Sequence, residues 1–248
     1  MNDPQKQRVA LVTGGAMRVG RALSLGLAAA GYDLVVTYRS SEAAARDLSA
    51  RVREAGRRCE LVAADLSEAR AAEAVIEVVR GSFGRLDLLV NSAASFEEAS
   101  LLDIDAERWD AVMNLNARAP HLLVRAGASL LKAAGGCVVN IADLSAFQPW
   151  TGRPHHAVSK AALVHLTKVQ ARALAPEVRV NAVAPGAVLP PEHLSEPSRQ
   201  ALAAAAPLGR LGSPDDVVEA VLYLAQAEFV TGQILAVDGG RLLGTSAP

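Results

Sequence analysis

Short apolar runs rich in β-branched residues alternate along the whole chain with longer Ala-rich stretches. Apolar runs bounded by glycine or polar residues predict buried strands, and the Ala-rich stretches predict helices. The predicted strands cover residues 8–13, 33–38, 58–63, 86–91, 136–142, 177–183 and 233–237. The predicted helices lie near residues 18–30, 41–55, 67–80, 105–134, 154–174 and 214–226. Because strict alternation favours right-handed βαβ crossovers, we expect one doubly wound α/β domain over residues 1–248, with about seven parallel strands and helices on both faces.

Composition and charge narrow the class of protein. The 248 residues are 51% hydrophobic but only 4% aromatic, so the core must be built from Ala, Val and Leu. The formal net charge is −1 and basic residues are scattered among acidic ones, which argues against nucleic-acid or membrane partners. The sequence shows neither an apolar signal core nor an uncharged stretch that could span a bilayer, so we expect a cytoplasmic protein with a small-molecule substrate. Cys59 and Cys137 lie far apart in apolar runs, which predicts buried free thiols and no metal site.

The Pro-rich segment 185–197 breaks the regular alternation after the sixth predicted strand. Loops at the ends of strands often carry binding residues, so this segment is a candidate lid over a ligand. The pattern does not predict the conformation of residues 187–206.

A glycine-rich turn follows the first predicted strand directly and opens a helix, reading Thr13-Gly14-Gly15-Ala16-Met17-Arg18-Val19-Gly20. In a doubly wound sheet, ligands bind beyond the carboxyl ends of the strands. Glycines at this place let the backbone turn tightly and approach a phosphate, whose charge is stabilised by the helix N-terminus. The turn alone is a weak signal, because glycine turns between a strand and a helix are common.

Further motifs follow the later strands in order. They are Asn91-Ser92-Ala93-Ala94, Asn116, Lys160, Pro185-Gly186 and Asp238-Gly239-Gly240. Together with the glycine turn, they resemble the short-chain dehydrogenase/reductase family over essentially the whole chain. The resemblance implies a Rossmann-type fold, a nicotinamide cofactor and, usually, a homotetramer.

The resemblance also implies roles for several of these residues. Lys160 would bind the nicotinamide ribose, and Asn116 would order a proton-relay water. The turn formed by Asn91, Ser92 and Ala93 would lie beside the same ribose, and Asp65-Leu66 would contact the adenine. Beyond Pro185 and Gly186, the backbone amide of Val188 would be offered to the carboxamide, while Pro190-Pro191-Glu192-His193 replaces a threonine-containing segment.

The end of the second predicted strand favours NADPH over NADH. NAD-binding proteins commonly place an acid there to hold the ribose hydroxyls, whereas NADP-binding proteins supply cations for the 2′-phosphate. Here the chain reads Tyr38-Arg39-Ser40-Ser41, with no acid before Glu42, and Arg18 adds a second cation. Arginine suits this task because its planar guanidinium makes bidentate, charge-assisted bonds to phosphate. The alternative is that both arginines are solvated surface residues.

Within the family, the chain resembles the branch of pteridine reductases and bacterial dihydromonapterin reductases. Arg18 replaces the middle glycine of the turn as it does in that branch, and Tyr38-Arg39-Ser40 resembles its phosphate-binding segment. The run Asn116-Ala117-Arg118-Ala119-Pro120 resembles its motif in the fourth helix.

Three residues extend the resemblance to the part of the site that binds the substrate. Ser95-Phe96 stands where the branch places an aromatic ring that stacks a pterin against the nicotinamide, and Asp143 stands where most of the family has the catalytic serine. These three residues and His156 are therefore expected to contact the substrate. The alternatives are an apolar loop anchor for Phe96 and a turn cap for Asp143.

One position departs from the family pattern of Tyr-x-x-x-Lys, which puts both side chains on one helix face. This chain reads His156-Ala157-Val158-Ser159-Lys160, and none of its tyrosines lies nearby. An imidazolium, with an ordinary pKa near ~6.5, is a stronger acid than a phenol near ~10, so a histidine can donate the proton that accompanies hydride transfer. The like charge of Lys160 favours the neutral ring, whereas the carboxylate of Asp143 favours the charged ring.

We therefore expect an NADPH-dependent oxidoreductase that reduces a pterin-like or carbonyl substrate, with His156, Asp143, Lys160 and Asn116 as the catalytic residues. A different hypothesis is a module that binds NADPH for sensing or interaction without reducing anything, which the missing tyrosine supports. His155 could be a substrate contact or an alternative acid, but we expect an exposed residue at the start of the helix.

Overall fold

Seven parallel strands form one sheet in the order β3-β2-β1-β4-β5-β6-β7. The structure, a computed structural model, describes residues 7–191 and 194–244. The strands are β1 (Arg8–Val12), β2 (Tyr32–Tyr38), β3 (Cys59–Ala63), β4 (Leu88–Asn91), β5 (Cys137–Ile141), β6 (Arg179–Pro185) and β7 (Ile234–Val237). The strand order reverses direction between β1 and β4, which is where ligands bind in sheets of this kind. The predicted doubly wound fold is confirmed.

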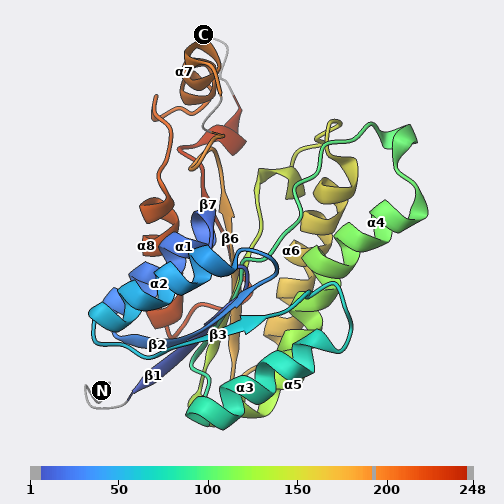
Figure 1. The fold of residues 1–248 in the computed structure, drawn as a ribbon. Coiled ribbons are helices and arrows are strands. Elements are labelled where there is room, and N and C mark those ends of the chain that lie inside the picture. Colours follow the sequence, from blue (N-terminus) through green and yellow to red (C-terminus); the bar gives the residue numbers. More distant parts are fainter. Residues whose placement is uncertain (1–6, 192–193, 245–248) are drawn as a thin grey trace.

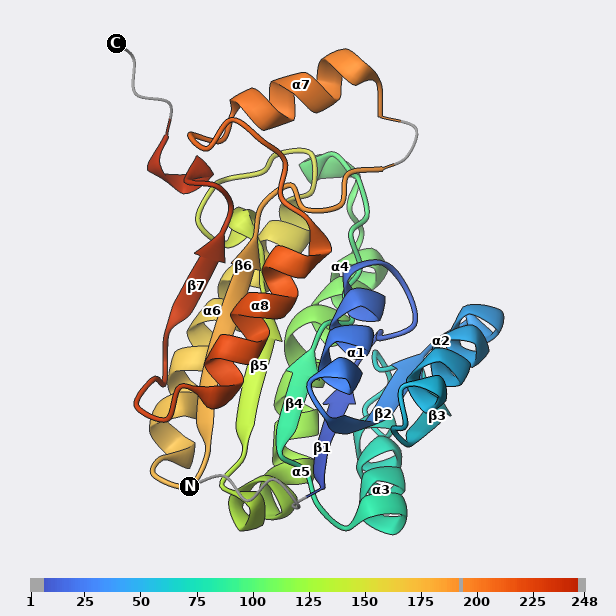
Figure 2. The same ribbon diagram turned by 90° about the vertical axis from the view of Figure 1, so that its left-hand side faces the viewer.

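Helices cover both faces of the sheet (Figures 1 and 2). The helices are α1 (Arg18–Ala29), α2 (Glu42–Glu54), α3 (Ala71–Phe83), α4 (Ala106–Met113), α5 (Ala119–Ala134), α6 (Pro154–Leu174), α7 (Glu196–Ala204) and α8 (Pro214–Gln226). On one face, α1 lies between α2 and α8, while α3, α5 and α6 lie on the other. No helix in the described part of the chain is long and apolar enough to cross a membrane.

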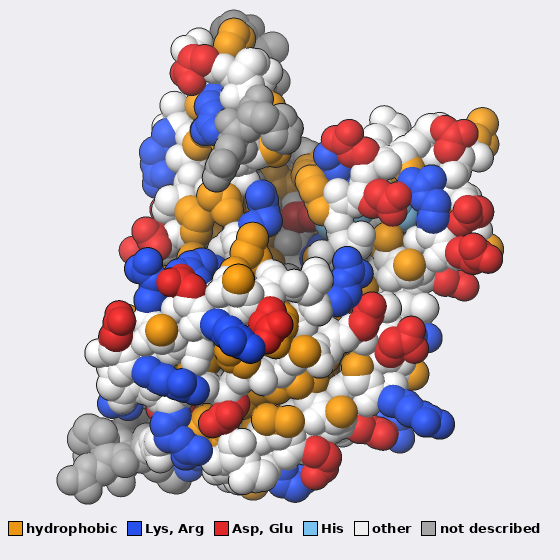
Figure 3. Space-filling model, viewed as in Figure 1, with side chains coloured by type: hydrophobic (Ala, Val, Ile, Leu, Met, Phe, Trp, Pro, Cys, Tyr) orange, Lys and Arg blue, Asp and Glu red, His pale blue; other side chains and the backbone are white. Residues whose placement is uncertain are grey.

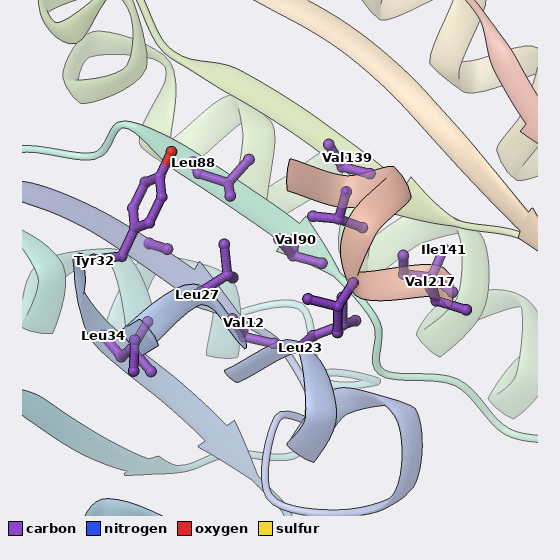
Figure 4. Packing of buried hydrophobic residues seen from close by; sticks show 14 of the residues in the cluster. Val12, Leu23, Leu27, Tyr32, Leu34, Leu88, Val90, Val139, Ile141 and Val217 are labelled. Carbon is purple, nitrogen blue, oxygen red and sulfur yellow. The ribbon is translucent and has the colours of Figure 1, made fainter. Parts of the chain in front are cut away.

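The core consists of aliphatic side chains on both faces of the sheet. Under α1 and α8, Leu23, Leu27 and Val217 pack on Val12 and Val90 of the central strands (Figure 4). Because parallel strands are covered on both faces, they read as continuous apolar runs. The two cysteines are free and buried in this core, as predicted, and burial raises the pKa of Cys137 to about 11.

The predicted helix 105–134 is interrupted by a π-helical turn at Asn114–Arg118, which separates α4 from α5. Pro120, at the start of α5, explains this difference. Its nitrogen carries no hydrogen for the carbonyl of Asn116 four residues earlier, and its ring crowds that carbonyl, so the regular α-helical bond cannot form there. The turn places Asn116 in the buried interior of the site described below.

The candidate lid contains a helix that the sequence analysis did not predict. Helix α7 lies beyond the carboxyl ends of β5 and β6 (Figure 2). Its signals were present in the sequence: Ser195 caps the helix by accepting from the backbone amide of Ser198, and Pro197 lies in the first turn. Glu192 and His193 of the lid lie outside the described residues.

Candidate active site

A cleft of about 570 Å³ lies beyond the carboxyl ends of the central strands. Figure 3 shows this side of the molecule hollowed between the part that carries α7 and the part that carries α4 and α6. The predicted site residues that line the cleft are Gly14, Arg18, Val19, Gly20, Tyr38, Arg39, Ser40, Asp65, Leu66, Ser92, Ala93, Ser95, Phe96, Asp143, His156 and Lys160. One cavity therefore joins the predicted nucleotide-binding segments to the predicted catalytic residues.

The glycine turn forms one wall of the cleft, and it leaves no room for a side chain at the position of Gly20. A Cβ on Gly20 would lie 2.3 Å from the carbonyl oxygen of Gly14, and Gly14 itself has a left-handed φ of +60°. The backbone amide of Gly14 donates to Oγ1 of Thr37 (3.1 Å), which fixes the turn on β2. The first turn of α1 then faces the cleft with amides that have no partner within the helix. Such an end suits a phosphate group, so the turn fits a dinucleotide.

The two predicted phosphate-binding arginines differ in their surroundings. Arg39 is exposed at the end of β2, beside Ser40, and its charge contributes to lowering the pKa of Asp65, which is lowered mainly by hydrogen bonds from Ser67. Arg18 has a φ of +50°, a left-handed conformation that is uncommon for any residue except glycine. Its guanidinium donates to the carbonyl of Leu189 (2.8 Å), which links the glycine turn to the lid.

Asp143 and His156 form a close pair at the other end of the cleft. Nε2 of His156 lies 2.5 Å from Oδ2 of Asp143. The other carboxylate oxygen of Asp143 accepts from the backbone amide of Ser145 (2.8 Å) and from its hydroxyl. Burial raises the pKa of Asp143, but the hydrogen bond from His156 and the charge of Lys160 outweigh burial, so the net shift is downward. The carboxylate is thus held in its charged form.

The partners of His156 determine which of its nitrogens carry protons. Nδ1 lies 2.7 Å from the carbonyl oxygen of Ser95, which can only accept a hydrogen bond. Nε2 faces the carboxylate of Asp143, which is also an acceptor. Nδ1 therefore faces the Ser95 carbonyl and, at 3.4 Å, the side-chain amide of Asn116, while Nε2 faces the carboxylate.

Asn116 and Lys160 are buried polar residues near the Asp143–His156 pair. The side chain of Asn116 accepts from the amide of Ser95 (2.8 Å) and donates to Oγ of Ser159 (2.9 Å), so it joins the Ser95 segment to α6. Nζ of Lys160 donates to the carbonyl of Ile141 (2.7 Å). Burial lowers the pKa of Lys160, although the charge of Asp143 opposes this shift.

Phe96 forms the rim of the cleft next to the pair. Its ring meets that of His156 edge-on, with centroids 4.8 Å apart and an angle of 88° between the planes. The residue is 54% exposed, so the ring contacts His156 and still has surface that a ligand could reach.

Comparison with known proteins identifies the family. A family profile described as enoyl-(acyl carrier protein) reductase matches residues 14–241. The chain belongs to the short-chain dehydrogenase/reductase family. It is 33% identical to a 3-oxoacyl-(acyl-carrier-protein) reductase of Thermotoga maritima, covering 95% of this chain and 98% of that one. It is 35% identical to 3β-hydroxysteroid dehydrogenase 1 of Eggerthella lenta, covering 98% and 97%. The structure of acetoin dehydrogenase from Enterobacter cloacae matches with a TM-score of 0.89 at 34% identity, covering 98% of this chain and 99% of that one.

Membership of the short-chain dehydrogenase/reductase family makes the chain an oxidoreductase of that type, and a nicotinamide cofactor is the one that the family implies. Four predicted cofactor-binding residues of this short-chain dehydrogenase/reductase do not line the cleft: Asn91, Pro185, Gly186 and Val188. Asn91 is buried in the sheet, where its amide donates to Asn140 (2.8 Å). The amide of Val188 donates to the carbonyl of Gly186 (2.9 Å), so it is already engaged.

The expectation that His155 is exposed is wrong. His155 is fully buried at the start of α6, and neither ring nitrogen has a hydrogen-bond partner among the described residues. Its Nε2 lies 3.8 Å from a carboxylate oxygen of Glu97. The loop that follows β4 packs over this end of the helix, and this long-range contact cannot be read from local sequence.

Two structural threonines of the short-chain reductase site were missed. Oγ1 of Thr13 accepts from the amides of Ser92 (2.9 Å) and Ala93 (3.0 Å) and so holds the turn after β4 beside the glycine turn. Thr37 fixes the glycine turn from β2, as described above. Both residues are polar and buried at the carboxyl ends of apolar strands, and that signal could have identified them.

Proposed function

We propose that this protein is an NADPH-dependent reductase in which the Asp143–His156 pair donates the proton. The 2.5 Å contact between Nε2 of His156 and Oδ2 of Asp143, inside the cleft, carries this proposal. The cofactor supplies a hydride to the carbon of a C=O or C=N bond when it is bound. The protein must then deliver one proton to the oxygen or nitrogen of the same bond.

The exposed fractions of the two side chains indicate where the proton leaves. The side chain of His156 is 2% exposed and that of Asp143 is 16% exposed. Asp143 is therefore the member of the pair that meets the substrate, and the imidazolium behind it supplies the proton through Oδ2. After the transfer the ring is neutral, and the pair regains its proton from water.

The residues at the nucleotide end support NADPH over NADH. Arg39 and Ser40 are exposed at the end of β2, where an acid would repel a 2′-phosphate. Arg18 lines the same cleft, where its guanidinium donates to the carbonyl of Leu189. We propose that it leaves this acceptor to bind the 2′-phosphate. Lys160 also lines the cleft, and we assign it to the nicotinamide ribose.

For the substrate, we propose a flat carbonyl or imine compound, with a pterin-like ring as one class. Phe96 offers an exposed aromatic surface next to the pair, and the carboxylate of Asp143 can accept hydrogen bonds from amino groups of such a ring. The printed names of the relatives point to oxoacyl, hydroxysteroid and acetoin substrates for those proteins, so keto compounds form the competing class.

A second candidate function is the binding of NADPH without reduction. Its support is that both ring nitrogens of His156 are occupied by protein acceptors and that the side chain is almost completely buried. A proton held in this way reaches a substrate only through Asp143.

The test is an assay of NADPH oxidation with the purified protein over a range of pH values. The panel contains dihydrobiopterin, dihydrofolate, diacetyl, an acetoacetyl thioester and a 3-ketosteroid, and NADH replaces NADPH in a parallel series. We expect turnover of at least one compound with NADPH, lost in His156→Phe without loss of NADPH binding.

Three outcomes would redirect the proposal. Unchanged turnover in His156→Phe would exclude the histidine as the acid. Binding of NADPH with no turnover across the panel would favour the second candidate. Equal use of NADH and NADPH would exclude phosphate recognition by the arginines.

We also propose a homotetramer from family membership, and light scattering on the same preparation checks it.

A further inference from the structure

The segment 95–99, which follows β4, lies against residues 152–156 at the start of α6. At one end of this contact, the carbonyl of Ser95 lies 2.7 Å from Nδ1 of His156. At the other end, the amide of Ala99 donates to the carbonyl of Gly152 (3.1 Å). Between these two backbone contacts, the segment is held by side chains. The Ser95 backbone is also held by Asn116, which accepts from its amide (2.8 Å) and donates to its carbonyl (3.2 Å). The side-chain contacts in the middle of the segment act on this carbonyl through Phe96.

Arg153 makes the principal contacts in that middle part. Its guanidinium lies over the ring of Phe96, 4.1 Å from the centroid, and it also pairs with the carboxylate of Glu98. A planar guanidinium can stack on a ring and bind a carboxylate at the same time, which an ammonium group cannot do equally well. Arg153, the residue that precedes α6, thus holds two residues of the segment.

The orientation of Phe96 is then fixed from two sides. The cation of Arg153 covers the ring, while the imidazole of His156 meets it edge-on at 4.8 Å. Trp150 adds a third aromatic contact at 6.3 Å, also edge-on. Because Ser95 directly precedes Phe96, holding the phenylalanine restrains, together with Asn116, the carbonyl that faces Nδ1.

Hydrogen bonds alone do not hold the guanidinium of Arg153 in its position over the ring. Its Nε atom is buried and has no hydrogen-bond partner within the described residues. The ring of Phe96 and the carboxylate of Glu98 are therefore what stabilise this guanidinium, and an exposed ion pair by itself contributes little. The contact with the ring is the part that orients the segment.

We propose that Arg153 is a positioning residue for the proton donor: by holding Phe96 and Glu98, it keeps the Ser95 carbonyl on Nδ1 of His156. This inference rests on the proposed function, in which the His156 imidazolium supplies the proton. The other charged groups near the ring are Asp143, which faces Nε2, and Lys160, one helical turn further along α6. Neither of them replaces the carbonyl at Nδ1.

The main test compares Arg153→Gln with Arg108→Gln. Arg108 binds Glu97 of the same segment but does not touch Phe96, so it is a matched control for general loosening of the loop. In Arg153→Gln we expect kcat to fall by roughly tenfold to a hundredfold, because a misplaced catalytic group loses rate steeply. The affinity for NADPH should stay unchanged, and the Arg108→Gln protein should resemble the wild type. Arg153→Lys keeps the charge and should recover part of the lost rate.

A readout independent of turnover is the exchange of the His156 ring protons with water, followed by nuclear magnetic resonance. The signals are assigned by their absence in His156→Phe. We expect faster exchange at Nδ1 in Arg153→Gln and an intermediate rate in Glu98→Gln, with no change in Arg108→Gln.

Unchanged exchange at Nδ1 in Arg153→Gln would overturn the proposal. Equal effects of Arg153→Gln and Arg108→Gln on exchange would overturn it as well, because they would show a general effect of the loop. If the wild type turned over no substrate, the proposed function would fail, yet the exchange measurement would still decide whether Arg153 positions the segment.

Discussion

The nucleotide end and the catalytic end of the cleft are built in different ways. At the nucleotide end, each residue belongs to a short segment that directly follows its own strand, as Gly14 follows β1 and Arg39 follows β2. At the catalytic end, the polar groups come from separate elements: Ser95 follows β4, Asp143 follows β5, and His156 lies in α6. The first end depends on local backbone geometry and the second on long-range contacts.

In the proposed function, this difference separates cofactor binding from proton transfer. Exposed cations and a glycine turn can bind a phosphate whatever the state of the buried pair. The pair works only if the carboxylate is charged and the carbonyl of Ser95 lies on Nδ1, and both conditions depend on burial and distance. Variants at the two ends should therefore damage different measured quantities.

The largest effect should come from Asp143→Asn. The amide removes the carboxylate that faces Nε2 and can place a donor there, so the proposed proton path through Oδ2 is lost. We expect kcat to fall by about a hundredfold or more, in the range of general acid catalysis, with NADPH affinity unchanged. Steady-state kinetics and a cofactor titration by fluorescence measure the two quantities. A variant that retained wild-type kcat would remove Asp143 from the proton path.

The next largest effect should come from Gly20→Ala, at the nucleotide end. The new Cβ would lie 2.3 Å from the carbonyl oxygen of Gly14, and a backbone atom cannot move aside cheaply. We expect NADPH affinity to fall by at least roughly tenfold, about 1.4 kcal/mol, and the melting temperature to fall as well. The control is Gly81→Ala in α3, where no atom lies within 4 Å of the new Cβ. That variant should gain about 0.5–1 kcal/mol of stability from helix propensity.

If Gly20→Ala bound NADPH normally, the close contact in the glycine turn would not be needed for the cofactor. A similar loss of stability in Gly81→Ala would show instead that any glycine substitution in a helix of this protein is harmful.

Arg39→Ala should have a smaller and more selective effect. Removing one charge-assisted bond to a 2′-phosphate costs about 1.5–3 kcal/mol, so NADPH affinity should fall by roughly tenfold to a hundredfold. The affinity for NADH should stay the same, since that cofactor lacks the phosphate. Calorimetric titration with both cofactors checks this, and an equal loss for both would contradict a phosphate-specific role for Arg39.

The sequence predicted residues in segments that directly follow a strand better than contacts between distant elements, for a physical reason. Gly14, Arg39 and Asp65 lie where a strand passes into a helix or loop, so neighbours in the sequence determine their surroundings. In contrast, the burial of His155 follows from packing of the loop after β4 over α6, between residues far apart in the chain. The π-helical turn before Pro120 also escaped the pattern, because a pattern of apolar positions shows a helix but not one widened turn within it.

The smallest effect concerns stability in acid, and it tests the charge of the pair directly. Because the pKa of Asp143 is lower in the folded protein than its ordinary value of about 3.9, its pairing stabilises the fold fully above that value. This stabilisation is lost as the pH falls through the lower, folded-state pKa. The wild type should therefore be more stable than Asp143→Asn near neutral pH, and the difference should shrink below about pH 4. Thermal unfolding of both proteins over the acidic range measures it. A difference in melting temperature that stays constant with pH would mean that the carboxylate contributes by packing and turn formation at Ser145, and not by its charge on His156.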